Sequence, residues 1–164
     1  MNKSTVSIKI IQKLCNKHNL SLSTAESCSG GYLSKLMTDT SGSSKFYNGS
    51  IIAYSNKVKT DILKVPNDVL VKSGAVSREV SILMAEGVLN LIDCDIAVST
   101  TGIMEQSKQD DNKAPQVYIT VKSHKHQSVI HHYLEGNRDE NRLKTINYAF
   151  ECLYDFINKH YLVS

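Results

Sequence analysis

The chain has 164 residues, of which 41% are hydrophobic and 21% are charged, and its formal net charge is +3. A chain of this size and composition can fold as one globular domain without a disulfide or a metal, so we expect a single domain over residues 1–164. Basic and acidic residues are intermixed, which excludes the basic block of a nucleic-acid-binding protein, and no window approaches the roughly 20 apolar residues of a membrane span. We therefore expect a cytoplasmic domain with no membrane partner and no direct nucleic-acid partner.

Apolar periodicity predicts helices that alternate with strands over the first part of the chain. Apolar residues spaced by three or four positions indicate amphipathic helices, and short apolar runs between turn residues indicate strands. In chain order we expect a helix over 5–18, a strand over 22–25, a helix from 32, a strand over 49–54, short helices over 57–63 and 66–70, a helix over 78–92 and a strand over 95–99.

The last third of the chain predicts a hairpin and a long helix. A polar segment over 105–113 has no periodicity and is expected to be a loop, followed by strands over 116–121 and 127–133 and by a helix that Asn137 caps. The alternation favours an α/β fold, a three-layer α/β/α sandwich with a mixed sheet of about five strands. Sites in such folds lie at the carboxyl ends of strands, which directs attention to Ser27 and Thr101.

A serine just after the first predicted strand is the first candidate for chemistry. In this place the Ser27 hydroxyl would project at the edge of the sheet, and backbone N–H groups of Cys28, Ser29 and Gly30 would stabilise an oxyanion. The other interpretation is structural, with Ser27 or Ser29 as the N-cap of the next helix, a common role for serine. The spacing leaves both interpretations open.

A serine nucleophile needs a base, and Lys59 is the best-placed candidate. The six histidines have no evident relation to the turn at Ser27, whereas Lys59 closely follows the strand predicted over 49–54. A lysine acts as a base only when it is neutral, and burial or a nearby cation lowers its pKa in that direction. The alternative is a solvated helix lysine, like Lys57, with no catalytic role.

The sequence offers little for metal or redox chemistry. The four cysteines are far apart and form no C-x-x-C pair, so they fit neither a zinc site nor a redox motif. His124, His126, His131 and His132 lie in the predicted hairpin region, but no acid or cysteine stands beside them at metal-ligand spacing. We expect neither a metal nor an organic cofactor.

Six segments of the chain carry a family resemblance. They are Thr24-Ala25-Glu26-Ser27-Cys28-Ser29-Gly30-Gly31, Ser41-Gly42-Ser43-Ser44, Tyr54-Ser55-Asn56 followed by Lys59, Gly74-Ala75-Val76-Ser77, Met84-Ala85-Glu86-Gly87 and Thr101-Gly102-Ile103. Together they span nearly the whole chain, which resembles the C-terminal domain of the CinA competence/damage-inducible family. On this resemblance residues 1–164 form a single CinA C-terminal-like domain.

The resemblance implies an activity and a fold. Stand-alone members of the family are nicotinamide mononucleotide deamidases, which hydrolyse the carboxamide to nicotinate mononucleotide and ammonia by a Ser–Lys mechanism. The implied partner is thus a small-molecule pyridine mononucleotide. The family fold, a mixed five-stranded sheet between helices, agrees with the predicted sandwich, and a symmetric homo-oligomer is a further expectation by family analogy.

Carried over position by position, the resemblance implies roles for particular residues. Ser27 is the implied nucleophile, Lys59 the general base and then general acid, and Tyr54 a hydroxyl that orients this pair. The implied substrate-binding residues are Cys28, Ser29, Gly30, Gly31, Thr101, Gly102, Arg138 and Arg142.

The two arginines of this set fall where family members have arginines. At positions i and i+4 beside a helix N-terminus, Arg138 and Arg142 share one face and would bind a phosphate. By local pattern alone, ion pairing with Asp139, Glu140 or Glu135 on a solvated face is an equal alternative.

The segment after Ile103 departs from the family pattern. Family members usually continue with Ala-Gly-Pro and a glycine-rich loop that closes over the substrate, whereas this chain reads Met104-Glu105-Gln106 and has no glycine before Pro115. Backbone that approaches a ligand closely is difficult to build without glycine. We therefore expect weak binding of the mononucleotide.

Two rival hypotheses follow from these observations. In the first, the chain is a catalytically silent relative that binds a nucleotide or a protein in a competence or DNA-damage context, with residues 104–114 as its interaction surface. In the second, Cys28 is the nucleophile, although no base is evident for its thiol. The intact pair of Ser27 and Lys59 favours the enzyme, whereas the altered segment favours the binding module.

Overall fold

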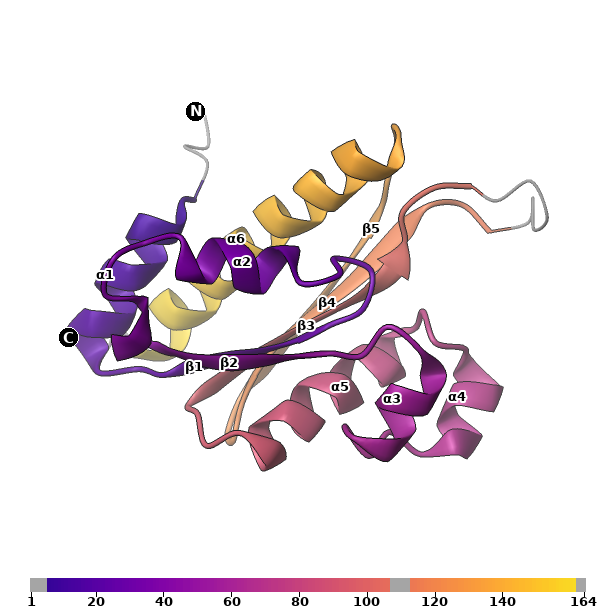
Figure 1. Cartoon of the computed structure of the whole chain (residues 1–164), viewed down its shortest axis with the longest axis horizontal. Coiled ribbons are helices and arrows are strands. Elements are labelled where there is room, and N and C mark those ends of the chain that lie inside the picture. The colour runs from indigo at the N-terminus through magenta and orange to yellow at the C-terminus, as the bar shows by residue number, and fades with distance from the viewer. Residues whose placement is uncertain (1–5, 107–112, 162–164) are drawn as a thin grey trace.

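Five strands form one sheet in the order β2-β1-β3-β4-β5 (Figure 1). The computed structural model describes residues 6–106 and 113–161. The first three strands pair in parallel and the last two are added antiparallel, so the sheet is mixed, as predicted. The strands are β1 (Leu22–Glu26), β2 (Tyr47–Ile52), β3 (Ile96–Ile103), β4 (Gln116–Ser123) and β5 (Gln127–Tyr133).

Helices cover both faces of the sheet and complete the predicted three-layer sandwich (Figure 1). Each face buries its own apolar cluster against the strands. On one face lie α1 (Ile8–His18), α2 (Tyr32–Thr38) and α6 (Arg138–Tyr161), and on the other lie α3 (Asn56–Asp61), α4 (Asn67–Ser73) and α5 (Arg78–Leu91), with a short 3-10 turn η1 (Ser43–Lys45) before β2.

Polar side chains cap the starts of three of these helices, among them the predicted cap Asn137. Ser55 and Ser77 each accept a hydrogen bond from the N–H three residues later, at 3.3 Å. Asn137 Oδ1 accepts from the N–H groups of Asp139 and Glu140, both at 3.0 Å. These bonds satisfy donors that the first turn of a helix leaves unpaired.

The second strand is shifted and the third strand is extended relative to their predicted bounds. The second strand is Tyr47–Ile52 instead of 49–54, because its pairing with β1 runs from Tyr47 to Ile52. The third strand continues through Ile103 instead of ending at residue 99, because β4 pairs with it along this whole length. Thr101 and Gly102 therefore belong to the end of a strand that extends beyond β1.

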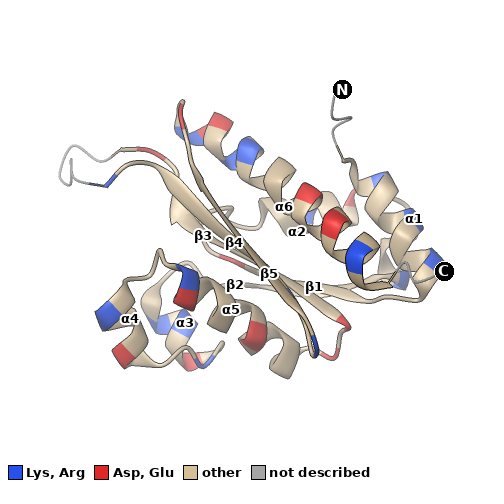
Figure 2. Cartoon of the chain, turned by 180° about the vertical axis from the view of Figure 1, so that it is seen from behind, with Lys and Arg blue, Asp and Glu red and all other residues tan. Residues whose placement is uncertain are grey.

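Charges of both signs share the helices on the outside of the molecule. The view from behind in Figure 2 shows Lys and Arg beside Asp and Glu along α6, α5 and α4. Among the helices that the structure describes, none is both long and apolar enough to cross a membrane.

Candidate active site

Ser27 stands where the backbone leaves the end of β1. Its N–H donates to the Thr100 carbonyl oxygen at 3.0 Å, so the residue still follows the line of the sheet. The next four residues turn into α2, with Gly30 and Gly31 at φ 62° and 94°, backbone conformations that favour glycine. The turn thus holds a nearly buried serine hydroxyl at the carboxyl end of the sheet.

Lys59 reaches Ser27 from the helix that follows β2. Its Nζ lies 3.0 Å from Ser27 Oγ, 2.7 Å from the Ala53 carbonyl oxygen and 3.4 Å from the Tyr54 carbonyl oxygen. The residue is only 1% exposed. The alternative of a solvated lysine is therefore wrong.

Burial lowers the pKa of Lys59, an effect that Cys28 offsets only in part. The cause is that surroundings without water disfavour the ammonium form. Among the described residues, no carboxylate contacts the Lys59 amine. A neutral amine also fits the contacts, because its two hydrogens can serve the two carbonyl oxygens while its lone pair accepts the Ser27 hydroxyl proton. This is the arrangement that a lysine general base requires.

A buried carboxylate holds the turn after β1. Glu26, which is fully buried, accepts hydrogen bonds from the N–H groups of Gly31 at 3.0 Å, Leu33 at 3.1 Å and Ser34 at 2.7 Å. It also accepts from the Ser29 hydroxyl at 2.7 Å. These N–H groups belong to the start of α2, where a helix lacks backbone partners. Glu26 therefore caps this helix, and the N-cap alternative for the turn serines is wrong.

Backbone N–H groups of the same turn are the candidates for binding an oxyanion. The Gly30 N–H donates to the Ser27 carbonyl oxygen at 3.1 Å, so one of the three predicted donors is already used. In the described part of the chain, no oxygen accepts from the N–H of Cys28 or of Ser29, and both groups interact with the Cys28 thiol. The oxyanion hole expected at residues 28–30 is thus reduced to those two groups.

Cys28 is buried next to the serine, and its thiol stays protonated. Burial raises the pKa of the Cys28 thiol to about 12, which outweighs the opposite effect of hydrogen bonds from Thr100 and from nearby backbone N–H groups. The thiolate is the nucleophilic form of cysteine. The environment of Cys28 therefore argues against the hypothesis that it is the nucleophile.

A cavity of about 340 Å³ adjoins the Ser27–Lys59 pair. This volume is at the lower end of the roughly 300–1,000 Å³ of small-molecule sites. The end of β3 and the residues after it line one side, and Tyr54 and Arg138 line another. The cavity thus brings together residues from well-separated parts of the chain, which we call the dyad cavity.

Thr101 and Gly102, at the end of β3, line the dyad cavity. The Thr101 hydroxyl donates to the Ala75 carbonyl oxygen at 2.7 Å. A Cβ atom at Gly102 would lie 2.4 Å from the Gln116 carbonyl oxygen, closer than any side chain allows. Gly102 is therefore needed for the close pairing of β3 with β4.

The Tyr54 hydroxyl does not contact the Ser27–Lys59 pair. The side chain is 60% exposed, and its hydroxyl accepts a hydrogen bond from Arg138 Nη2 at 3.0 Å. Only the main-chain carbonyl of Tyr54 touches Lys59. Because β2 ends at Ile52, Tyr54 lies at the rim of the cavity, and the expectation that its hydroxyl orients the pair is not met.

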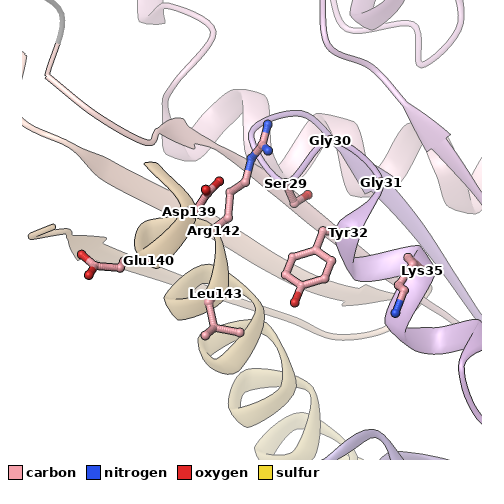
Figure 3. Close-up of a pocket in the computed structure, with 9 residues that line it drawn as sticks. All are labelled: Ser29, Gly30, Gly31, Tyr32, Lys35, Asp139, Glu140, Arg142 and Leu143. Atoms are coloured by element: carbon pink, nitrogen blue, oxygen red, sulfur yellow. The ribbon is translucent and has the colours of Figure 1, made fainter. Parts of the chain in front are cut away.

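The two predicted arginines reach different cavities. Arg138 lines the dyad cavity, where its Nη1 lies 3.3 Å from Glu105 Oε1. Arg142 lines a neighbouring cavity of about 750 Å³, in which Figure 3 shows its guanidinium directed toward Ser29 and Gly30. The structure therefore does not bring both guanidinium groups to one phosphate site.

Two residues of the site, Glu105 and Glu26, have roles that the sequence alone did not assign. Glu105 is the acidic partner of Arg138, in place of the predicted Asp139, Glu140 or Glu135. A helix-face pattern cannot show this partner, because it lies 33 positions away in the sequence. Glu26 belongs to the quoted family motif, but its capping of α2 becomes visible only when the turn is folded.

Three of the four histidines in the hairpin region stack on other rings. The ring centroids of His126 and His160 are 4.1 Å apart, those of His131 and Tyr118 are 4.2 Å apart, and His132 lies against Tyr148. Within residues 6–106 and 113–161, no group of three or more His, Cys, Asp or Glu side chains is arranged to hold a metal ion. Most of the segment 104–114, in which an interaction surface was predicted, lies outside the described residues.

Comparisons with known proteins give the relatives of this chain. The family model described as CinA C-terminal domain matches residues 4–157. A CinA-like protein of Dictyoglomus thermophilum is 36% identical over 146 residues, which are 88% of this chain and 36% of the relative. A CinA-like protein of Cytophaga hutchinsonii is 48% identical over 93 residues, which are 57% of this chain and 22% of the relative. The chain thus spans about a third or less of the length of these curated relatives.

Solved structures show the same fold. The competence/damage inducible protein CihA from Agrobacterium tumefaciens has a TM-score of 0.80 and 34% sequence identity, with 90% of each chain covered. A competence-damaged protein (CinA) superfamily protein from Escherichia coli has a TM-score of 0.85 at 24% identity, with 95% of this chain and 94% of that chain covered. At that identity the second likeness concerns the fold alone.

Proposed function

The chain belongs to the CinA C-terminal domain family, and on this premise we propose that it is an amide hydrolase of the nicotinamide mononucleotide deamidase type. The reaction would convert the pyridine carboxamide to a carboxylate with release of ammonia. Its chemistry would depend on Ser27 as nucleophile and Lys59 as base, and it would require no metal or organic cofactor.

One observation carries the proposal. The Lys59 amine, buried and without a carboxylate among its described contacts, lies 3.0 Å from Ser27 Oγ. A lysine that only stabilised the fold would be expected to pair with an acid when it is this buried. A neutral amine beside a serine hydroxyl is instead the arrangement of a nucleophile with its base.

The proposed reaction proceeds in two steps. As Ser27 Oγ attacks the carboxamide carbon, Lys59 Nζ accepts the hydroxyl proton and then donates it to the departing nitrogen, which leaves as ammonia. Water next attacks the acyl ester as Lys59 takes a proton from it. The Ser27–acyl bond then breaks as Lys59 returns that proton to Ser27 Oγ, and the carboxylate is released. The N–H groups of Cys28 and Ser29 are the proposed donors to the oxyanion in both steps.

The substrate would enter through the dyad cavity. Its wall at Thr101 and Gly102 would lie along the pyridine ring, and Arg138 at the rim is the candidate for an anionic group of the ligand. Arg142 in the neighbouring cavity is the second candidate for such a group. These roles, like a symmetric homo-oligomer, are part of the proposal.

The direct test is to incubate the purified protein with nicotinamide mononucleotide. We expect equal amounts of ammonia and nicotinate mononucleotide, measured by a coupled ammonia assay and by chromatography. Nicotinate mononucleotide as the starting compound is the matched control, because it lacks the carboxamide and must yield no ammonia. Binding of the mononucleotide without any product, by a folded protein, would overturn the proposal and favour the silent binding module.

A further inference from the structure

Arg138 is held by two neighbours at the rim of the dyad cavity. Its Nη1 lies 3.3 Å from Glu105 Oε1, and its Nη2 donates to the Tyr54 hydroxyl at 3.0 Å. Both terminal nitrogens of the guanidinium are thus engaged by groups of the protein. A ligand anion that used the paired donors of this guanidinium would have to replace these partners.

The charges around this cavity are few. Among the described residues that line it, Lys59, Glu105 and Arg138 are the ones with acidic or strongly basic side chains. Lys59 is buried under Ser27, and burial lowers its pKa. At the rim, the charge of Arg138 is therefore opposed directly by that of Glu105.

Glu105 stands at the departure from the family pattern. Glu105 lies two residues after Ile103, the last residue of the Thr101-Gly102-Ile103 motif. The preceding residue, Met104, is anchored, because its carbonyl oxygen accepts from Asn141 Nδ2 at 2.7 Å and the side chain is buried. This anchor fixes the point from which Glu105 reaches Arg138.

We propose that Glu105 is a specificity-determining residue, which disfavours phosphorylated substrates by neutralising Arg138 at the entrance of the dyad cavity. The proposal deepens the amide hydrolase function and rests on it. A phosphate monoester carries about 1.5 to 2 negative charges at pH 7, so it must both displace the Glu105 carboxylate from Arg138 and remain close to it. A pyridine nucleoside without the phosphate meets neither cost, and specificity is set by this difference in binding.

The test compares two substrates that differ only in the phosphate. Nicotinamide mononucleotide and nicotinamide riboside share the scissile carboxamide and the ribose. For Glu105→Gln, which removes the charge and keeps the shape, we expect the KM for the mononucleotide to fall about tenfold. The KM for the riboside should stay within about twofold, and kcat should change little for either substrate.

Glu135→Gln is the matched control. It removes one negative charge from an exposed position close to α6, and Glu135 does not line the dyad cavity. This variant should leave the ratio of the two KM values as it is in the unaltered protein. An equal effect of Glu105→Gln and Glu135→Gln would overturn the proposal, because general charge would then explain the change.

A binding measurement separates this proposal from the proposed function. Ribose 5-phosphate has the phosphate but no amide, so its binding by calorimetry does not depend on turnover. We expect Glu105→Gln to bind it about tenfold more tightly than the unaltered protein. Absence of hydrolysis of both amides would refute the hydrolase, whereas unchanged ribose 5-phosphate binding and an unchanged KM ratio would refute the role of Glu105.

Discussion

Ser27 and Cys28 place a hydroxyl and a thiol side by side at one turn, and alanine substitutions separate their roles. Ser27→Ala should abolish amide hydrolysis, because the acyl-enzyme requires the hydroxyl. Cys28→Ala should keep most of the activity, since burial raises the pKa of this thiol to about 12 and leaves no thiolate near neutral pH. Ammonia release by the two variants, with circular dichroism as the check of folding, decides between them. An active Ser27→Ala variant together with an inactive Cys28→Ala variant would contradict the role of Ser27 as the nucleophile.

The role of Lys59 as a base predicts how kcat/KM depends on pH. Burial lowers its pKa in the folded protein, below the ordinary value of about 10.4. Only the neutral amine accepts the Ser27 proton, so kcat/KM should be low below the folded pKa and should rise as the pH increases through it. Lys59→Arg should be inactive across the range, because arginine stays protonated. The pH–rate profiles of both proteins provide the measurement, and an arginine variant with substantial turnover would rule out proton transfer by residue 59.

The same pKa shift affects stability with a definite sign. Between the lowered folded pKa and the unfolded value of about 10.4, the unfolded chain binds more protons at residue 59 than the folded chain. This residue's contribution to stability therefore improves as the pH rises through that interval. Below the folded pKa the contribution is constant and unfavourable, because the ammonium form is then buried.

At the scale of single elements, α2 depends on a side chain that lies outside it. Glu26 belongs to β1, yet its carboxylate accepts from the N–H groups at the start of α2 and from the Ser29 hydroxyl. Strand, turn and helix are thereby joined around one buried group. The position of Ser27 between Glu26 and Ser29 means that this network also fixes the nucleophile.

Glu26→Gln tests this network. The amide would present a donor where the carboxylate has two accepting oxygens, so at least one buried N–H would lose its partner. We expect a loss of about 2–3 kcal/mol in the free energy of unfolding, measured by chemical denaturation. Asp39→Asn at the other end of α2 is the control, since its ion pair with Lys35 is exposed, and its denaturation midpoint should not change. Equal midpoints for both variants would contradict the capping role.

At the scale of the whole molecule, the position of Lys59 depends on how two helices of one layer pack. Gly87 in α5 lies against the backbone that follows α3, and a Cβ atom there would be 2.2 Å from the Leu63 carbonyl oxygen. The Val65 N–H in turn donates to the Lys59 carbonyl oxygen at 3.0 Å. A displacement at Leu63 would therefore be transmitted to the segment that carries the base.

Gly87→Ala should destabilise the protein although alanine favours helices. Alanine is better than glycine in a helix by about 1 kcal/mol, but the backbone at Leu63 cannot give way as a flexible side chain would. We expect a net loss of about 1–3 kcal/mol and reduced amide hydrolysis. Asn90→Ala, at an exposed position of the same helix, should be neutral or slightly stabilising. Thermal unfolding of both variants gives the comparison, and a more stable Gly87→Ala protein would show that the contact is loose.

The order and type of the main helices and strands follow from the sequence by itself. Apolar periodicity is local, so it predicts the alternation of helices and strands, and the cap residues Ser55, Ser77 and Asn137 mark helix starts through bonds that span only three residues. The same local signals place Ser27 after a strand, and the family motifs single out Lys59.

Only the tertiary structure decided the contacts between distant segments of the chain. The length of β3 depends on its pairing with β4, and burial of Lys59 depends on α3 folding back onto the end of β1. Arg138 pairs with Glu105 instead of an acid of its own helix. In each case the partner is dozens of residues away or on another element. A hydrogen bond or a desolvated charge acts over a few ångströms of space, whatever the length of chain between the two interacting groups.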